Sequence, residues 1–227
     1  MKNTDSLRDE IRMQQKKISH ESFSKKLEYF WDYYKIQVMI TVLLACMFGS
    51  ILNGIISQKE TMVSIALINA FPNTEDELLK ADFESYLELN TKKQQVLIDS
   101  TYYLDDDSSS PYATTYSQKF STNAMAGKLD VVLADGGNFD FYGNQGFFQN
   151  LSLILPQEML DIYEDSFYYA DLPYDETTDL VPIGIKINNA SKIGEYACYP
   201  GVEAYYGIVS NSQNIDYAIS YLNYINE

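Results

Sequence analysis

The sequence predicts an α/β protein: a single three-layer lobe with a mostly parallel sheet, preceded by a single transmembrane helix. Three observations predict this fold. A stretch of 21 residues at 36–56 carries no charge, strand-like and helix-like patterns alternate after it, and the chain ends in an amphipathic helix. Because 46% of the 227 residues are hydrophobic, the part after the apolar stretch can bury a core. We expect three parts, at residues 1–35, 36–57 and 58–227.

The apolar stretch lies between Lys35 and Lys59. As a helix that rises about 1.5 Å per residue, it would cover about 30 Å, the thickness of the hydrocarbon core of a bilayer. A cleaved signal peptide fits less well, because a long charged segment precedes the stretch. Leu43-Leu44-Ala45-Cys46 matches a lipoprotein cleavage site, but the apolar run continues for ten residues beyond Cys46. A retained membrane span is the favoured interpretation.

The charges on the two sides of the span predict its orientation. Residues 1–35 hold eight basic and six acidic side chains, whereas residues 60–227 hold seven basic and 26 acidic ones. Basic flanks of a membrane helix stay in the cytoplasm. We therefore expect a single-pass protein of the plasma membrane, with a cytoplasmic amino terminus and an extracellular carboxyl-terminal domain.

The end of the cytoplasmic tail is expected to form an amphipathic juxtamembrane helix on the inner membrane surface. Trp31, Tyr34 and Lys35 are the expected membrane anchors, because aromatic and basic side chains favour the headgroup region. Small or polar residues recur every four positions on one face of the span, a spacing that allows close helix packing or is simply ordinary composition. These candidate helix-packing residues are Ala45, Gly49 and Asn53.

The domain after the span alternates strands and helices. Apolar runs at 62–71, 95–103 and 129–134 predict buried strands, and patterns of helical period lie between them. This β-α-β-α-β order favours a parallel sheet with covering helices. Further strands are expected at 181–187 and 204–210. The apolar face of the final helix is expected to hold Ile215, Ala218, Ile219, Leu222 and Ile225.

The carboxyl edge of this sheet is the expected ligand-binding edge, because ligands of open α/β sheets bind outside the carboxyl ends of the strands. The third strand runs into Asp135-Gly136-Gly137-Asn138 at this edge. Oxygens of Asp135, Asn138 and Asp140 could also meet a calcium ion, but their spacing does not match the EF-hand loop, and a solvated acidic loop is favoured. The candidate ligand-binding residues are Asn69, Tyr102, Asp135, Asn138 and Tyr142.

Composition argues against several classes of function. A net charge of −16 opposes binding to nucleic-acid phosphates. Two cysteines and one histidine are too few for a disulfide framework, a cysteine zinc site or most histidine-based catalysis. We therefore predict no catalytic residue, no metal ion and no cofactor. The many acidic side chains leave a carboxylate pair for glycoside hydrolysis open.

Several stretches resemble known proteins. Residues 127–135, 146–156 and 206–222 are similar to segments of extracellular solute-binding proteins of ABC importers, which have the type 2 periplasmic-binding fold. The juxtamembrane segment Phe30-Trp31-Asp32-Tyr33-Tyr34-Lys35 resembles membrane anchors of Gram-positive bacterial proteins. Members of the solute-binding family have two lobes that close on a ligand, whereas residues 60–227 have the length of one domain. The resemblance implies the fold of one lobe.

These observations predict a non-enzymatic binding or assembly module at the cell surface, an accessory subunit of a transporter or of another surface complex. Its expected partners are the lipid bilayer and another membrane or cell-surface protein. Two alternatives stay open. One is a membrane-tethered solute-binding receptor of an ABC importer, with a small-molecule ligand, and the other is a surface hydrolase.

Overall fold

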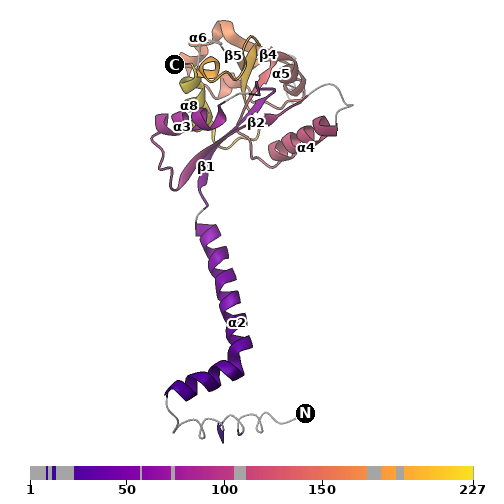
Figure 1. Cartoon of the computed structure of the whole chain (residues 1–227). Coiled ribbons are helices and arrows are strands. Elements are labelled where there is room, and N and C mark those ends of the chain that lie inside the picture. Colours follow the sequence, from indigo (N-terminus) through magenta and orange to yellow (C-terminus); the bar gives the residue numbers. More distant parts are fainter. Residues whose placement is uncertain are drawn as a thin grey trace. The chain divides into compact units, whose positions relative to one another are not determined.

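The computed structural model describes residues 9, 12–13, 23–56, 58–72, 75–104, 111–172, 180–187 and 192–226. The chain divides into two compact units, Met1–Gln58 and Lys59–Glu227 (Figure 1). Most of the expected cytoplasmic tail before Phe23 lies outside the described residues, as does the side chain of Asn53.

The first unit contains the long helix α2, Phe23–Ile56, of 34 residues. The expected juxtamembrane helix and the expected span are therefore parts of one helix. Its segment Tyr34–Leu52 is long and apolar enough to cross a membrane, and none of the apolar window is buried. Thr41 donates its hydroxyl hydrogen to the carbonyl oxygen of Gln37 at 2.8 Å, so this side chain brings no unpaired donor into an apolar surrounding. Such a helix near the amino terminus suits a membrane anchor or a secretion signal.

The second unit is built on a six-stranded sheet with the order β2-β1-β3-β6-β5-β4. The strands are β1 Glu60–Ile68, β2 Gln94–Tyr102, β3 Val131–Asp135, β4 Phe167–Ala170, β5 Val181–Ile187 and β6 Ala204–Ile208. The first three pair in parallel, whereas β6, β5 and β4 add on through three antiparallel pairings. The sheet is mixed, so the expectation of a mostly parallel sheet was wrong beyond β3.

The connections explain this change of direction. A parallel neighbour needs a long crossover, usually a helix, and such helices connect β1 to β2 and β2 to β3. Between β5 and β6 the described residues contain only the four-residue helix α7, so no long helix carries the chain back. The short strand β4 was not expected from the sequence. The remaining helices are α3 Asp76–Tyr86, α4 Pro111–Met125, α5 Gly136–Gly143, α6 Gln157–Ile162, α7 Lys192–Glu195 and α8 Ile215–Ile225, with 3-10 turns at Leu151–Leu153 and Glu164–Ser166.

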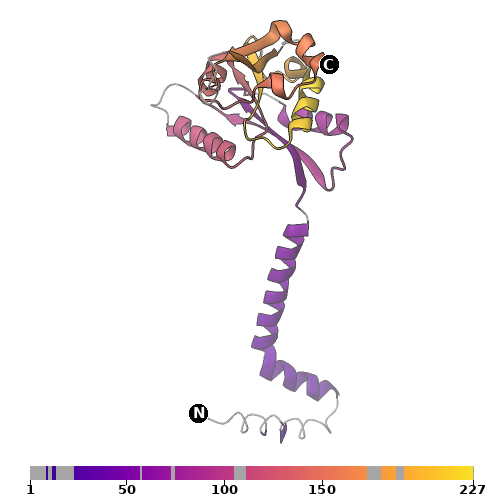
Figure 2. The same cartoon turned by 180° about the vertical axis from the view of Figure 1, so that it is seen from behind.

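Helices cover both faces of the sheet, as the three-layer prediction requires. The chain moves from β1 outward to β2 and then back across β1 to β3, so α3 and α4 fall on opposite faces. Figures 1 and 2 show α3 and α8 on one side of β1 and α4 on the other. Alternate β1 residues accordingly enter two cores, with Ile65 packed on the α3 and α8 side and Ile68 on the α4 side. The expected inner face of α8 is confirmed, because Ala218, Leu222 and Ile225 are buried.

An aromatic cluster fills the core on the α4 side. The rings of Phe139 and Phe148 stack with centroids 4.3 Å apart and an interplanar angle of 9°. Two glycines make room for this pair, since a Cβ at Gly184 would lie 2.3 Å from Phe139 and one at Gly207 would lie 2.7 Å from Phe148. Phe147 continues the cluster toward the surface, with its ring centroid 5.3 Å from that of Phe148. Larger residues at either glycine would displace the stacked rings.

Candidate functional site

The carboxyl edge of the parallel strands brings together three of the five expected ligand-binding residues. Asn69 follows β1, Asp135 ends β3, and Asn138 lies in the first turn of α5. The Asp135 carboxylate caps α5 by accepting a hydrogen bond from the backbone N–H of Asn138 at 3.1 Å. Its other oxygen accepts from Asn69 Nδ2 and from Asn138 Nδ2, both at 2.9 Å. These three side chains therefore lie together at the carboxyl edge, and their role in ligand binding stays a prediction.

The same side chains also hold the residue after β2. Asn69 Nδ2 donates to the carbonyl oxygen of Leu104 at 2.8 Å, and Leu104 N–H donates to Asn69 Oδ1 at 2.8 Å. Asn69 adopts a left-handed backbone conformation with φ 54°, which asparagine tolerates better than most residues. The cluster therefore ties three strand ends to one another, and its polar groups already bond within the protein.

The other two candidates, Tyr102 and Tyr142, belong to the α4 side of the core. Tyr102 is buried, and Asn123 donates a hydrogen bond from Nδ2 to its hydroxyl oxygen at 2.9 Å. Tyr142 is half-buried, with its ring centroid 4.9 Å from that of Phe120. Burial raises the pKa of both hydroxyls, so both stay protonated at neutral pH. The structure separates these two side chains from the polar cluster.

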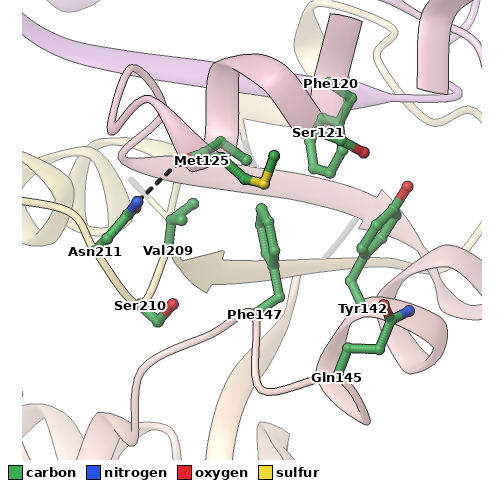
Figure 3. Close-up of a pocket in the computed structure, with 10 residues that line it drawn as sticks. Phe120, Ser121, Met125, Tyr142, Gln145, Phe147, Val209, Ser210 and Asn211 are labelled. Atoms are coloured by element: carbon green, nitrogen blue, oxygen red, sulfur yellow. Dashed lines mark hydrogen bonds between the residues drawn. The ribbon is translucent and has the colours of Figure 1, made fainter. Parts of the chain in front are cut away.

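A hollow lies at the opposite edge of the sheet, near the amino end of β3. We call it the α4 pocket, and its volume is about 270 Å³. It lies between the last turns of α4, the turn after α5 and the loop after β6 (Figure 3). Its lining residues are Phe120, Ser121, Ala124, Met125, Tyr142, Gln145, Phe147, Val209, Ser210 and Asn211.

Two amide side chains at the α4 pocket have a defined orientation. Asn211 donates through Nδ2 to the carbonyl oxygen of Ala124 at 2.9 Å, and Gln145 donates through Nε2 to the carbonyl oxygen of Phe141 at 3.0 Å. A carbonyl can only accept, so the nitrogen of each amide must face it. Among the residues that the structure describes, no donor bonds to the remaining amide oxygen of either side chain. These oxygens are acceptors available at the pocket.

A second hollow, of about 440 Å³, lies beside the α4 pocket and shares Ser210 with it. Its wall is mainly apolar, and its member Leu153 is 80% exposed. The full lining is Gly146, Phe148, Gln149, Asn150, Leu153, Ile154, Leu172 and Ser210. We call it the Leu153 hollow.

Of the five expected ligand-binding residues, Tyr142 lines the α4 pocket and none lines the Leu153 hollow. Residues 146–156 were noted only for their resemblance to solute-binding proteins. No local signal joins Phe120, Phe147 and Asn211, because they meet only after the sheet has formed. Near the α5 helix, Tyr168 donates its hydroxyl hydrogen to Asp140 at 2.6 Å. Burial, followed by the bond to Asp140, raises the pKa of Tyr168 to about 12.

Two further polar side chains, Cys198 and Tyr199, have structural roles. Cys198 is buried, and burial raises the pKa of its thiol to about 12, so the thiol stays protonated and is a poor nucleophile. Tyr199 donates its hydroxyl hydrogen to carbonyl oxygens of β1 and β3, those of Ile68 at 2.7 Å and Leu133 at 2.8 Å. Within the described ranges, no group of three or more histidine, cysteine, aspartate or glutamate side chains is placed to hold a metal ion.

Comparison with known proteins assigns no relative to this chain: no protein family matches it, and no curated protein matches it at a significant level.

Proposed function

We propose that this chain is a membrane-anchored, non-enzymatic binding or assembly module, whose α/β domain lies outside the plasma membrane and contacts another membrane or cell-surface protein. One observation carries the proposal. The segment Tyr34–Leu52 of α2 carries no charge after Lys35 and is apolar enough to span a membrane, and none of its apolar window is buried by the protein. A core helix of a soluble protein would have its apolar face covered, whereas a bilayer covers all sides of a spanning helix.

The orientation follows from the flanking charges. Eight basic residues lie within residues 1–35, before the uncharged stretch 36–56, while the domain after it is strongly acidic. The positive-inside rule then leaves the acidic domain outside the cytoplasm. Two aromatic residues support a membrane span rather than either orientation, because Trp31 lies just before the segment and Tyr34 begins it, where aromatic rings favour the headgroup region.

The Leu153 hollow is the surface that we assign to the protein partner. Leu153 and Ile154 present apolar side chains beside Phe148 and Leu172. Leu153 is 80% exposed, Ile154 and Leu172 are half-buried, and Phe148 forms the buried floor. An exposed apolar side chain over an apolar hollow is a common feature of protein contact sites. Two potential catalytic groups are also engaged in the structure, which supports a binding role. The Cys198 thiol is buried, and the Asp135 carboxylate accepts hydrogen bonds from two asparagine side chains.

A tethered solute receptor is the second candidate, and one observation favours it. Asn69, Asp135 and Asn138 lie together where an open α/β sheet binds its ligand. A solute at this edge would have to replace bonds that these side chains now make to one another. The one-lobe likeness to type 2 solute-binding proteins belongs to this candidate. Saturable calorimetric binding of a solute, lost in Asp135→Ala, would favour the receptor over the assembly module.

Cysteine labelling of intact cells tests the membrane orientation. The Cys46→Ser substitution removes the exposed native thiol, and the other native cysteine, Cys198, is buried. A cysteine added at an exposed position is then the thiol that reacts. Gln213→Cys should react with a membrane-impermeant maleimide on whole cells. Met13→Cys, also exposed, should react only after the cells are permeabilised. Labelling in the reverse order would overturn the proposed orientation, and loss of the chain from carbonate-washed membranes would overturn the anchor.

Site-specific crosslinking in the native membrane tests the partner surface. A photo-crosslinking residue at Leu153 should capture a membrane or surface protein. The matched control is Ile162 on α6, which is similarly exposed at 72% but does not line the hollow. Equal capture from both positions, or capture from neither, would contradict the assignment of the Leu153 hollow.

A further inference from the structure

The α4 pocket has aromatic walls. Phe147 extends into the hollow toward Met125, with Tyr142 on one side of it and Val209 on the other (Figure 3). The Phe147 and Tyr142 ring centroids lie 5.4 Å apart, and that of Phe120 lies 5.3 Å from Phe147. These packed rings have fixed positions, so they offer a preformed apolar surface to a ligand.

The polar groups of the pocket are neutral acceptors and hydroxyls. The amide oxygens of Gln145 and Asn211 are left available because the amide nitrogens face backbone carbonyls. Ser121 and Ser210 add hydroxyl groups to the lining. A ligand that satisfies this set must bring several hydrogen-bond donors. Hydroxyl groups meet this need best, since each can donate a hydrogen bond to an amide oxygen and accept one from a serine hydroxyl.

The charge and the volume of the pocket further limit the class of ligand that can bind. None of the lining residues is ionisable near neutral pH, although residues 60–227 carry 26 acidic and seven basic side chains. A charged ligand would lose its hydration here without gaining an ion pair, so the pocket favours a neutral one. Its volume of about 270 Å³ is below the 300–1,000 Å³ typical of pockets for drug-sized molecules, which leaves space for about one ring.

We propose that the α4 pocket binds one neutral sugar ring of a cell-surface glycan. The apolar C–H face of the ring packs on Phe147 and Tyr142, and its hydroxyls donate to the oxygens of Gln145 and Asn211. The site lies at the amino end of β3, away from the Asn69–Asp135–Asn138 cluster. The inference deepens the proposed binding role and rests on it, because the glycan is met only if the domain is outside the membrane.

Methyl NMR of the full chain in lipid nanodiscs tests the proposal. Met125 lines the pocket and is 81% exposed, so its ¹³C-methyl signal reports on occupancy. Met159 lies in the other core and serves as the internal reference. The probes are methyl glucoside, methyl galactoside, N-acetylglucosamine and maltotriose. At least one neutral probe should shift the Met125 signal saturably with a Kd of about 1 mM, the range expected of a single small ring.

Two variants separate binding from folding. Gln145→Ala removes an acceptor from an exposed side chain and should weaken binding by about fivefold, as the loss of one hydrogen bond does. The matched control is Asn144→Ala, whose exposed side chain bonds Asp140 and does not line the pocket, and it should leave the Kd unchanged. Phe147→Leu keeps an apolar side chain but removes the ring, so it should weaken binding while the Met159 signal stays in place.

Four outcomes would overturn the proposal. The first is that no neutral probe shifts the Met125 signal saturably at about 10 mM, well above the expected millimolar Kd. The second is that glucuronate binds more tightly than its neutral counterpart, and the third is that Gln145→Ala and Asn144→Ala have equal effects. The fourth is that the single ring binds but maltotriose does not. Retention of the chain in the nanodisc is scored separately. A retained chain with an unmoved Met125 signal rejects this inference alone, whereas a chain that leaves the nanodisc rejects the proposed anchor.

Discussion

The two ends of strand β3 use an aspartate in different ways. Asp135, at the carboxyl end, is half-buried and accepts hydrogen bonds from the side chains of Asn69 and Asn138 and from one backbone N–H. Asp130, just before the amino end, is 3% exposed. It accepts from Ser64 N–H at 2.9 Å, from the Ser212 hydroxyl at 2.7 Å and from the Asn214 amide at 3.2 Å.

The difference decides which edge keeps polar groups available. At the carboxyl end, the side chains that could meet a ligand already bond one another. At the amino end, one buried carboxylate holds the loop after β6 through Ser212 and Asn214. That loop carries Ser210 and Asn211, which line the α4 pocket. Position relative to a strand end is therefore not enough to identify a binding edge; the partners of each polar group must also be known.

The largest effect is expected from Asp130→Ala. The substitution leaves the buried donors of Ser64, Ser212 and Asn214 without their acceptor, so it should lower the free energy of unfolding by about 3 kcal/mol or more. Urea unfolding of the detergent-solubilised chain, followed by near-ultraviolet circular dichroism, measures the loss. Asp130→Asn retains one acceptor and should cost less. A loss below about 1 kcal/mol for the alanine variant would contradict the role of Asp130.

Asn69→Ala is expected to be the next most damaging. It removes the bonds to Leu104 and Asp135 and places alanine at φ 54°, for a combined loss of about 2 kcal/mol. Asn69→Gly removes the same bonds but tolerates that backbone conformation, so it should cost about 1 kcal/mol less than the alanine variant. Unfolding midpoints of the two variants give the difference. Equal losses would show that the backbone conformation adds no strain.

Two buried tyrosines provide a matched pair with a smaller effect. The Tyr199 hydroxyl bonds the carbonyl oxygens of Ile68 and Leu133, so Tyr199→Phe should cost about 1 kcal/mol. The Tyr221 hydroxyl is equally buried but has no hydrogen-bond partner among the described residues. Tyr221→Phe should therefore be neutral or slightly stabilising. Thermal unfolding of both variants decides the comparison, and equal losses would contradict it.

The smallest effect is expected at Asp82, whose carboxylate makes the stability of the fold depend on pH. Tyr224 donates a hydrogen bond to Asp82 at 2.8 Å and lowers the pKa of that carboxyl below 3.8, against burial, with help from Tyr196 and Lys192. Because the folded pKa is the lower one, this carboxylate stabilises the fold above about pH 3.8, and the stabilisation is lost as the pH falls through the folded pKa.

Asp82→Asn tests this contribution. Because the carboxylate is 42% exposed, the loss on acidification should be less than about 1 kcal/mol. Urea midpoints of the parent chain should fall more steeply between about pH 5 and about pH 2 than those of Asp82→Asn. Parallel slopes would show that Asp82 adds nothing to the acid sensitivity of the fold.

Local patterns predicted part of this architecture. The strands β1, β2 and β3 and the inner face of α8 were predicted because apolar runs and helical spacing record which residues face a core. The meeting of Asn69 with Asp135 was also predictable, since parallel strands place their carboxyl ends at one edge. The helix α5 was missed: Asp135, Asn138 and Asp140 were interpreted as parts of a solvated acidic loop, whereas Asp135 caps a helix at this position. The antiparallel addition of β6 was missed because pairing direction depends on the connections.

The sequence by itself determined the uncharged helix of membrane-spanning length, the acidic character of the domain after it and the α/β layering, because each depends on the composition or period of a continuous segment. Only the tertiary structure decided which polar groups are already bonded and where the hollows lie. Those features depend on residues far apart in the chain, such as Ala124 with Asn211 and Asn69 with Asp135, whose contacts exist only once the sheet order has placed them side by side.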